Sequence, residues 1–148
     1  MRAMEISYTA LDVEWRRLEV ISENLANANS AGAVKGAGYR ELNLVSGPRD
    51  NFSTYHNRED GSDPGIDVAN LNGVMVRSIV ASNAPPRLVH EPGNPLADAQ
   101  GFVAYPTIDH VQQMTKMVET ARIYEANLVA MNIAREMYGR ALQMGSQG

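Results

Sequence analysis

The 148-residue sequence has no cysteine, which excludes disulfide bonds and thiolate metal sites. Aromatic residues make up only 6%, so few large side chains are present to anchor a compact core. No stretch reaches the roughly 18 apolar residues of a membrane-spanning helix, so we expect no direct membrane insertion. The net charge is −4 and lysine and arginine form no run, which disfavours binding to nucleic acid.

The N-terminus lacks the uncharged apolar segment that a signal peptide needs, because Glu5, Asp12 and Glu14 interrupt it. By sequence, the protein is cytosolic or is exported by a route that removes no signal peptide.

Catalytic and ligand-binding motifs are also missing. The sequence has no G-x-S-x-G, G-x-x-x-x-G-K or H-E-x-x-H motif, and the glycines of residues 32–40 follow a predicted helix rather than a strand. The three histidines are far apart, and the three aspartates of the polar segment do not follow the order of a calcium loop. These residues are His56, His90 and His110, and Asp60, Asp63 and Asp67. We therefore expect no enzyme activity, cofactor, metal or small-molecule substrate.

Proline and glycine are concentrated in the middle of the chain. All seven prolines lie between Pro48 and Pro106, and nine of the twelve glycines lie between Gly32 and Gly101. Both residues disfavour helix interiors. The sequence thus predicts a helix at each end and an irregular or β-rich middle.

The C-terminal segment from Val111 to Met144 contains no proline and a single glycine, Gly139. Its apolar residues form two lines that lie on nearly opposite sides of a helix. The first line is Met114, Met117, Ala121, Tyr124, Leu128, Met131, Tyr138 and Leu142, and the second is Ile123, Ala126, Ala130, Ile133, Met137 and Met144. Asp109 and Gln112 have the spacing of a capping box, and Gly145 can end the helix. Arg135 interrupts the first line, either as a surface side chain or as a partner of Glu14 or Glu125 across a subunit boundary.

The N-terminal segment repeats this pattern over residues 4–28. One line consists of Met4, Leu11, Leu18 and Leu25, with Ile21 and Ala28, and the other consists of Ile6, Val13 and Val20. Two helices that are each apolar on opposite sides cannot cover one another completely. A helix in the core of a bundle is the alternative, but a bundle needs four helices and the chain supplies two. We therefore expect other chains to supply the missing partners.

The middle region predicts short strands at Tyr39–Val45, Gly73–Ala81, Arg87–His90 and Phe102–Tyr105, with a polar loop at 46–72. The predicted fold is α+β, with two terminal helices packed as a coiled-coil-like pair and a small β-rich middle. The expected units are an N-terminal helix at 1–31, a β-rich middle domain at 32–106 and a C-terminal helix at 107–148.

Two segments carry a resemblance to a known family. Residues 21–32, ISENLANANSAG, closely resemble the N-terminal signature of bacterial flagellar rod and hook proteins, with Asn24, Ala26, Asn27 and Asn29 at matching positions. Residues 86–106 are similar to the middle of the proximal rod proteins, although His90 and Phe102 stand where tyrosine is usual. The matching positions of this second segment include Pro92, Gly93, Pro95, Asp98, Gly101 and Pro106.

The resemblance implies a structural component of the flagellar basal body, part of the proximal rod. Such a rod is a helical tube that transmits motor torque, carries the export channel and crosses the periplasm. Implied partners are copies of the chain itself, other rod proteins and the flagellar type III export apparatus. Another rod or hook subunit of the same family is one alternative, and a binding module with a coiled-coil stem is the other.

We expect the three signature asparagines to fix the end of the first helix. The positions predicted to pack helices in the assembly are Leu11, Leu18, Ile21, Leu25, Met117, Tyr124, Leu128, Met131, Tyr138 and Leu142. Leu25→Asp or Leu128→Asp is predicted to abolish rod incorporation and motility without loss of expression.

Overall fold

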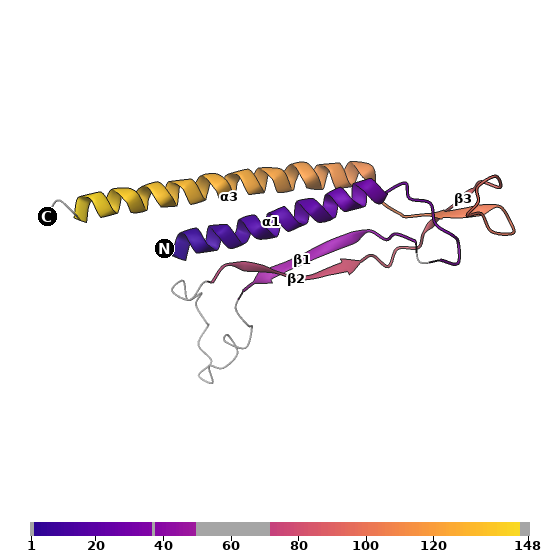
Figure 1. Cartoon of the computed structure of the whole chain (residues 1–148), viewed down its shortest axis with the longest axis horizontal. Helices are drawn as coiled ribbons and strands as arrows, with labels where there is room; N and C mark the ends of the chain where they lie inside the picture. Colours follow the sequence, from indigo (N-terminus) through magenta and orange to yellow (C-terminus); the bar gives the residue numbers. More distant parts are fainter. Residues whose placement is uncertain (1, 37, 50–71, 146–148) are drawn as a thin grey trace, which may run out of the picture.

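The structure is a computed structural model that describes residues 2–36, 38–49 and 72–145. Two long helices, α1 (Arg2–Asn27) and α3 (His110–Gly145), lie side by side and run in opposite directions (Figure 1). Two antiparallel hairpins lie between them in the sequence. The predicted pair of terminal helices with a small antiparallel β region in the middle is therefore confirmed.

The first hairpin pairs β1 (Leu42–Pro48) with β2 (Val74–Ala81), and the second pairs β3 (Arg87–His90) with β4 (Phe102–Tyr105). β3 and β4 have the predicted bounds. β1 starts three residues later than the predicted Tyr39–Val45 strand. Tyr39 instead turns toward α1, where its hydroxyl donates a hydrogen bond of 2.9 Å to Asn24 Oδ1.

A β-bulge changes which side chains of β2 share a face. The register moves from Val45↔Ser78 to Ser46↔Val76, so Arg77 is the extra residue on β2. Residues opposite one another in an antiparallel pair point to the same side. Ile79 therefore lies on the same face of the hairpin as Val76, whereas strict alternation would place Ser78 on that face.

Helix α1 is the middle layer, between α3 and the β1–β2 hairpin (Figure 1). Thr9 Oγ1 accepts a hydrogen bond of 3.1 Å from the Val74 backbone N–H of β2, so this side of α1 faces the hairpin. Val13 and Val20 lie on the same side by helical periodicity and are only 2% and 6% exposed. The expectation that another chain covers the second apolar side of this helix is wrong, because the chain's own hairpin covers that side.

Among the described residues, helix α3 is covered on one side only. Its less exposed positions include Gln113, Met117, Thr120, Tyr124, Asn127, Met131 and Ala134. These positions are spaced alternately by four and three, which places them on one side of the helix, toward α1. Three of the seven are polar. The line of residues that faces α1 therefore differs from the predicted first apolar line at every second position. The prediction followed apolar residues, whereas several residues that face α1 are polar.

The β3–β4 hairpin lies at the end of the molecule where α1 ends and α3 begins (Figure 1). It is tied to the segment after α1 by two backbone hydrogen bonds between Gly32 and Ala104, of 2.8 and 3.0 Å. Helix α3 starts shortly after β4, at the predicted cap. Asp109 Oδ1 accepts hydrogen bonds from the backbone N–H groups of Val111 and Gln112 at 2.9 and 3.2 Å.

Candidate functional site: a polar cluster and an uncovered helix

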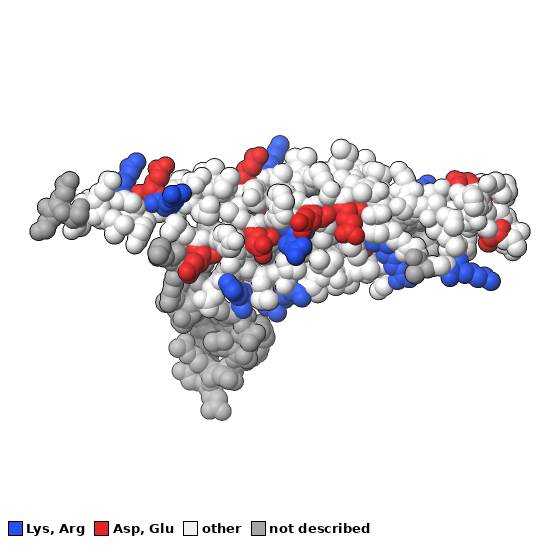
Figure 2. Space-filling model, viewed as in Figure 1, with Lys and Arg blue, Asp and Glu red and all other residues white. Residues whose placement is uncertain are grey.

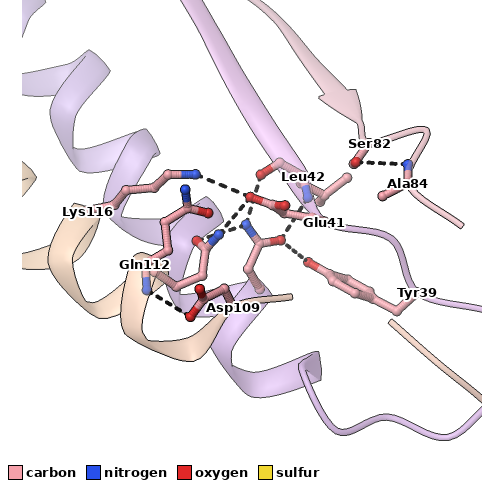
Figure 3. Close-up of polar contacts among 10 residues, drawn as sticks. Tyr39, Glu41, Leu42, Ser82, Ala84, Asp109, Gln112 and Lys116 are labelled. Atoms are coloured by element: carbon pink, nitrogen blue, oxygen red, sulfur yellow. Dashed lines mark hydrogen bonds and ion pairs between the residues drawn. The ribbon is translucent and has the colours of Figure 1, made fainter. Parts of the chain in front are cut away.

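Asn24 connects three parts of the fold. Its Nδ2 donates hydrogen bonds to the Leu42 carbonyl at 2.8 Å and to Gln113 Oε1 at 3.3 Å. Its Oδ1 accepts from the Leu42 backbone N–H at 2.8 Å and from the Tyr39 hydroxyl at 2.9 Å (Figure 3). The side chain is 1% exposed and uses both donors and both acceptor sites of its amide. It therefore joins the end of α1 to the start of β1 and the first turn of α3.

The cluster continues through Gln113, which is also 1% exposed. Its Nε2 donates a hydrogen bond of 2.7 Å to Glu41 Oε1, and the same oxygen lies 3.3 Å from Lys116 Nζ (Figure 3). Because each polar group has a partner, the buried amides do not carry an uncompensated desolvation cost.

Tyr39 is held as a hydrogen-bond donor in this cluster. Burial, together with the nearby carboxylates of Glu23 and Glu41, raises its pKa from the ordinary value of 10.0 to about 12. The hydroxyl is therefore protonated at neutral pH and donates to Asn24.

The other signature residues near the end of α1 act locally or lie exposed. Asn27 Nδ2 donates to the Glu23 carbonyl at 2.9 Å, and its Oδ1 accepts from the Ser30 hydroxyl at 3.1 Å. Ala26 and Asn29 are exposed. The structure thus brings only Asn24 into the buried cluster.

The signature residues of the second segment shape the loop between β3 and β4. Asp98 Oδ1 accepts hydrogen bonds of 2.9 Å from the backbone N–H groups of Gln100 and Phe102. Gly101 has a φ of +81°, a conformation that L-residues other than glycine rarely adopt. Pro92, Gly93 and Pro95 are exposed in the same loop, whereas Pro106, after β4, is buried.

The two departures from the usual tyrosines lie opposite one another. His90 and Phe102 pair across β3 and β4, and their rings meet edge to face with centroids 5.2 Å apart.

The predicted helix-packing residues fall into three groups. Leu11 and Ile21 are buried. The partly exposed ones are Leu18, Leu25, Met117, Tyr124 and Met131. Tyr124 contacts Trp15 of α1 with ring centroids 6.2 Å apart. Leu128, Tyr138 and Leu142 are exposed, so the described part of the chain leaves them uncovered.

The uncovered surface of α3 is extensive and apolar. Its exposed large apolar residues are Val111, Met114, Val118, Ile123, Leu128, Val129, Ile133, Met137, Tyr138, Leu142 and Met144. The uncovered side of α1 differs, because it carries the exposed acidic residues Glu5, Asp12, Glu19 and Glu23. Figure 2 shows acidic side chains along the middle of the molecule, with much of the α3 surface uncharged.

Comparison with known proteins identifies the family of this chain. A family model described as the C-terminal region of the flagellar basal body rod FlgEFG proteins matches residues 99–144, which include β4 and nearly all of α3. The flagellar basal-body rod protein FlgC of Escherichia coli O6:H1 is 34% identical over 145 residues, covering 98% of this chain and 97% of the relative. FlgC of Bacillus subtilis is 30% identical over 148 residues, covering 97% and 96%. This chain belongs to the FlgC family of flagellar basal-body rod proteins.

As a FlgC family member, the chain is a structural component of the basal-body rod and is located there. It is not an enzyme. The resemblance that the two signature segments carry is confirmed. Among the residues that the structure describes, no group of three or more histidine, aspartate or glutamate side chains is placed to hold a metal ion. His56, Asp60, Asp63 and Asp67 lie outside the described residues, as does the part of the predicted 46–72 loop from residue 50 to 71. Residues 46–48 were predicted to begin that loop, but they belong to β1, which pairs with β2 as far as Pro48.

Neither described helix combines the length and the apolarity needed to cross a bilayer.

Glu14 of α1 is a largely buried carboxylate with a raised pKa. Its side chain is 13% exposed, and its Oε2 lies 3.3 Å from Arg17 Nε of the same helix. Burial raises the pKa of Glu14 above 4.5, Arg17 opposes that rise, and Glu119 of α3 adds to it. Within the described chain Glu14 forms its ion pair with Arg17. The pairing of Arg135 with Glu14 or Glu125 across a subunit boundary stays a prediction.

We expect Glu14→Gln to alter the pH dependence of stability. A carboxyl with a raised folded-state pKa stabilises the fold fully below its unfolded pKa of about 4.5, and this contribution is lost as pH rises through the folded value. The variant should therefore gain free energy of unfolding relative to the native chain as pH rises through that window. Urea unfolding of the purified native chain and of Glu14→Gln at several pH values measures this difference. The same substitution type at an exposed carboxylate, Asp12→Asn, is the control. A difference that does not change with pH would refute it.

Proposed function

We propose that this chain assembles with copies of itself and with other rod proteins into the proximal rod, a helical tube that transmits motor torque and carries the export channel. The single observation that supports this best is the uncovered apolar surface of α3. Met137 is 66% exposed and Ile133 is 53% exposed. A soluble monomer rarely leaves so long an apolar surface in water, whereas an assembly buries it.

In this proposal α1 and α3 act as a coiled-coil-like pair. The alternation of four and three residues along the α1-facing side of α3 supports such packing. The buried amides of Asn24 and Gln113 would set its register, as a single polar position does in other helix pairs. We further propose that the chain reaches the rod through the flagellar type III export apparatus, without a cleaved signal peptide, and crosses the periplasm as part of the rod.

Leu128→Asp tests the assembly. Leu128 is 39% exposed in the single chain, so a carboxylate there should change the free energy of unfolding by no more than about 0.5 kcal/mol. Burying that charge in an assembly is costly, so we expect the variant to be absent from purified basal bodies and the cells to lose motility. Soft-agar motility and immunoblots of isolated basal bodies measure this.

A matched control adds the same charge at Asn132, an exposed polar residue of α3. Cells that carry Asn132→Asp should swim normally. Leu25→Asp is the less specific variant, because Leu25 is partly buried and its replacement also weakens the chain's own fold. Normal incorporation and swimming of Leu128→Asp would contradict the proposal.

A further inference from the structure

Strand β1 has an open edge on the side away from β2. In an antiparallel pair, successive residues direct their backbone groups alternately toward the partner strand and away from it. Glu41 and Arg49, which flank β1, form backbone hydrogen bonds of 2.7 and 3.0 Å with the residues that flank β2. The residues at even positions between them, Leu42, Leu44 and Ser46, therefore direct their N–H and C=O groups away from β2.

The first position on this open edge is filled by a side chain that imitates a third strand. Asn24 of α1 accepts a hydrogen bond from the Leu42 N–H and donates one to the Leu42 carbonyl, both at 2.8 Å. A residue of a neighbouring antiparallel strand makes the same pair of bonds. Among the described residues, no hydrogen bond reaches the outward backbone groups of Leu44 and Ser46, so the edge stays open beyond Leu42.

A groove of about 220 Å³ runs along this open edge. Leu42 and Leu44 line one side of it, and Ile123 of α3 lines the other. Helix α1, the layer between α3 and the hairpin, contributes Val20 and Ile21 (Figure 1). Four residues of β1 along the groove span about 13 Å, so the groove matches the length of about four residues of one added strand.

The groove carries one carboxylate that has no ion pair among the described residues. Lys116 pairs with Glu41, and Arg17 pairs with Glu14, both at 3.3 Å. Glu119 of α3 also lines the groove and is exposed, but no described cation lies within ion-pair distance of it. Burial is the main cause of the raised pKa of Glu14, and the charge of Glu119 adds to it. A basic side chain in the groove would therefore be favoured beside Glu119.

A second copy of this chain offers no suitable strand among its described residues. β1, β2, β3 and β4 are all paired within hairpins, so each would bring a partner strand about 4.8 Å away. The groove leaves no room for two strands, because it lies between β1 and α3, which are joined at one end by Lys116 and Glu41 (Figure 3). An unpaired extended segment of a different protein meets the requirement.

We infer that an extended segment of a different rod protein docks in this groove as a third strand on β1. Its backbone bonds to Leu44 and Ser46, an apolar side chain packs on Val20 and Ile21, and a lysine or arginine pairs with Glu119. Such strand addition obtains its affinity from main-chain hydrogen bonds and its specificity from the side-chain contacts. This inference rests on the proposed function and adds to it the way in which a second rod protein is held.

Hydrogen exchange at single residues tests the third strand. In the purified chain, the Leu44 amide should exchange about 100-fold faster than the amides of Asn43 and Val45, which are bonded to β2. In isolated basal bodies, exchange of the Leu44 amide should slow by about 100-fold. A Leu44 amide that is already protected in the purified chain, or that exchanges equally fast in basal bodies, would overturn the inference.

Leu44→Pro and Leu44→Ala form a matched pair. Both remove the leucine side chain, but proline also removes the outward N–H, which β2 does not use, so the hairpin should form in both variants. In basal bodies, Leu44→Pro should be about ten-fold less abundant than Leu44→Ala. Equal incorporation of the two variants would contradict the third strand. If the thermal midpoint of purified Leu44→Pro is the lower one, hydrogen exchange of the unsubstituted chain decides.

Glu119→Lys separates docking from stability. Because Glu119 repels Glu14, the lysine should leave the thermal midpoint of the purified chain unchanged or raise it. Incorporation into basal bodies should nevertheless fall about ten-fold, since the lysine repels the basic side chain of the docked segment. A purely structural role of Glu119 would change the midpoint and incorporation in the same direction, and normal incorporation would count against the basic partner.

A photo-cross-linker identifies the occupant. We expect p-benzoylphenylalanine in place of Ile123, on irradiation of isolated basal bodies, to form an adduct with a segment of a different rod protein. No adduct, or an adduct with a second copy of this chain, would overturn the assignment. None of these results affects the proposed function, which fails instead if the unsubstituted chain is absent from basal bodies.

Discussion

Asn24→Leu is expected to lower the free energy of unfolding by about 3–4 kcal/mol. Leucine has a similar size but forms no hydrogen bond, so the Leu42 backbone N–H and carbonyl lose their side-chain partner at the start of β1. The Tyr39 hydroxyl and Gln113 Oε1 also lose a partner in a buried site. Urea or thermal unfolding of the purified chain measures the change.

Asn27→Ala is the matched control. Among the described residues, its side chain bonds only to Glu23 and Ser30 nearby in sequence, so its loss should cost about 1 kcal/mol. Asn24→Leu should also reduce the protection of the β1 amides from hydrogen exchange, whereas Asn27→Ala should leave it unchanged. If the two variants were equally stable, Asn24 would not be the connection that holds β1 and α3 to α1.

Gly73→Ala is expected to cost about 2–4 kcal/mol, for two reasons that act together. Gly73 has a φ of +90°, which strains any residue with a Cβ. The added Cβ would also overlap Thr9 Oγ1, the atom that accepts the hydrogen bond from the Val74 backbone N–H. The variant should therefore push the β1–β2 hairpin away from α1 and lower the midpoint of unfolding.

Gly93→Ala provides the comparison, because a Cβ there meets no atom within 4 Å. We expect its effect to stay within about 0.5 kcal/mol. Thr9→Ala should reduce the cost of Gly73→Ala in a double-mutant cycle, because it removes the overlapping oxygen. Additive effects of the two substitutions would show that Thr9 and Gly73 do not approach one another as described.

The two terminal helices and the positions of β3 and β4 could be predicted from residue patterns. Proline and glycine lie where a helix cannot continue, and Asp109 caps α3 where its spacing indicates. These features depend on neighbours within a few residues, which sequence patterns describe well. The rod family was also recognisable, because the two signature segments include residues with specific local tasks, such as Asp98 in its loop.

The tertiary structure was needed to decide which surface each helix side contacts. Periodicity indicated that α1 and α3 each have two apolar sides, but it could not show that the hairpin covers the second side of α1 and that most of α3 stays open. The α1-facing line of α3 contains Gln113, Thr120 and Asn127, and Gln113 can be buried there because Asn24, 89 positions earlier, bonds to it. A local sequence pattern indicates that a side chain will be buried. Only long-range contacts determine which part of the protein, or which neighbouring chain, covers it.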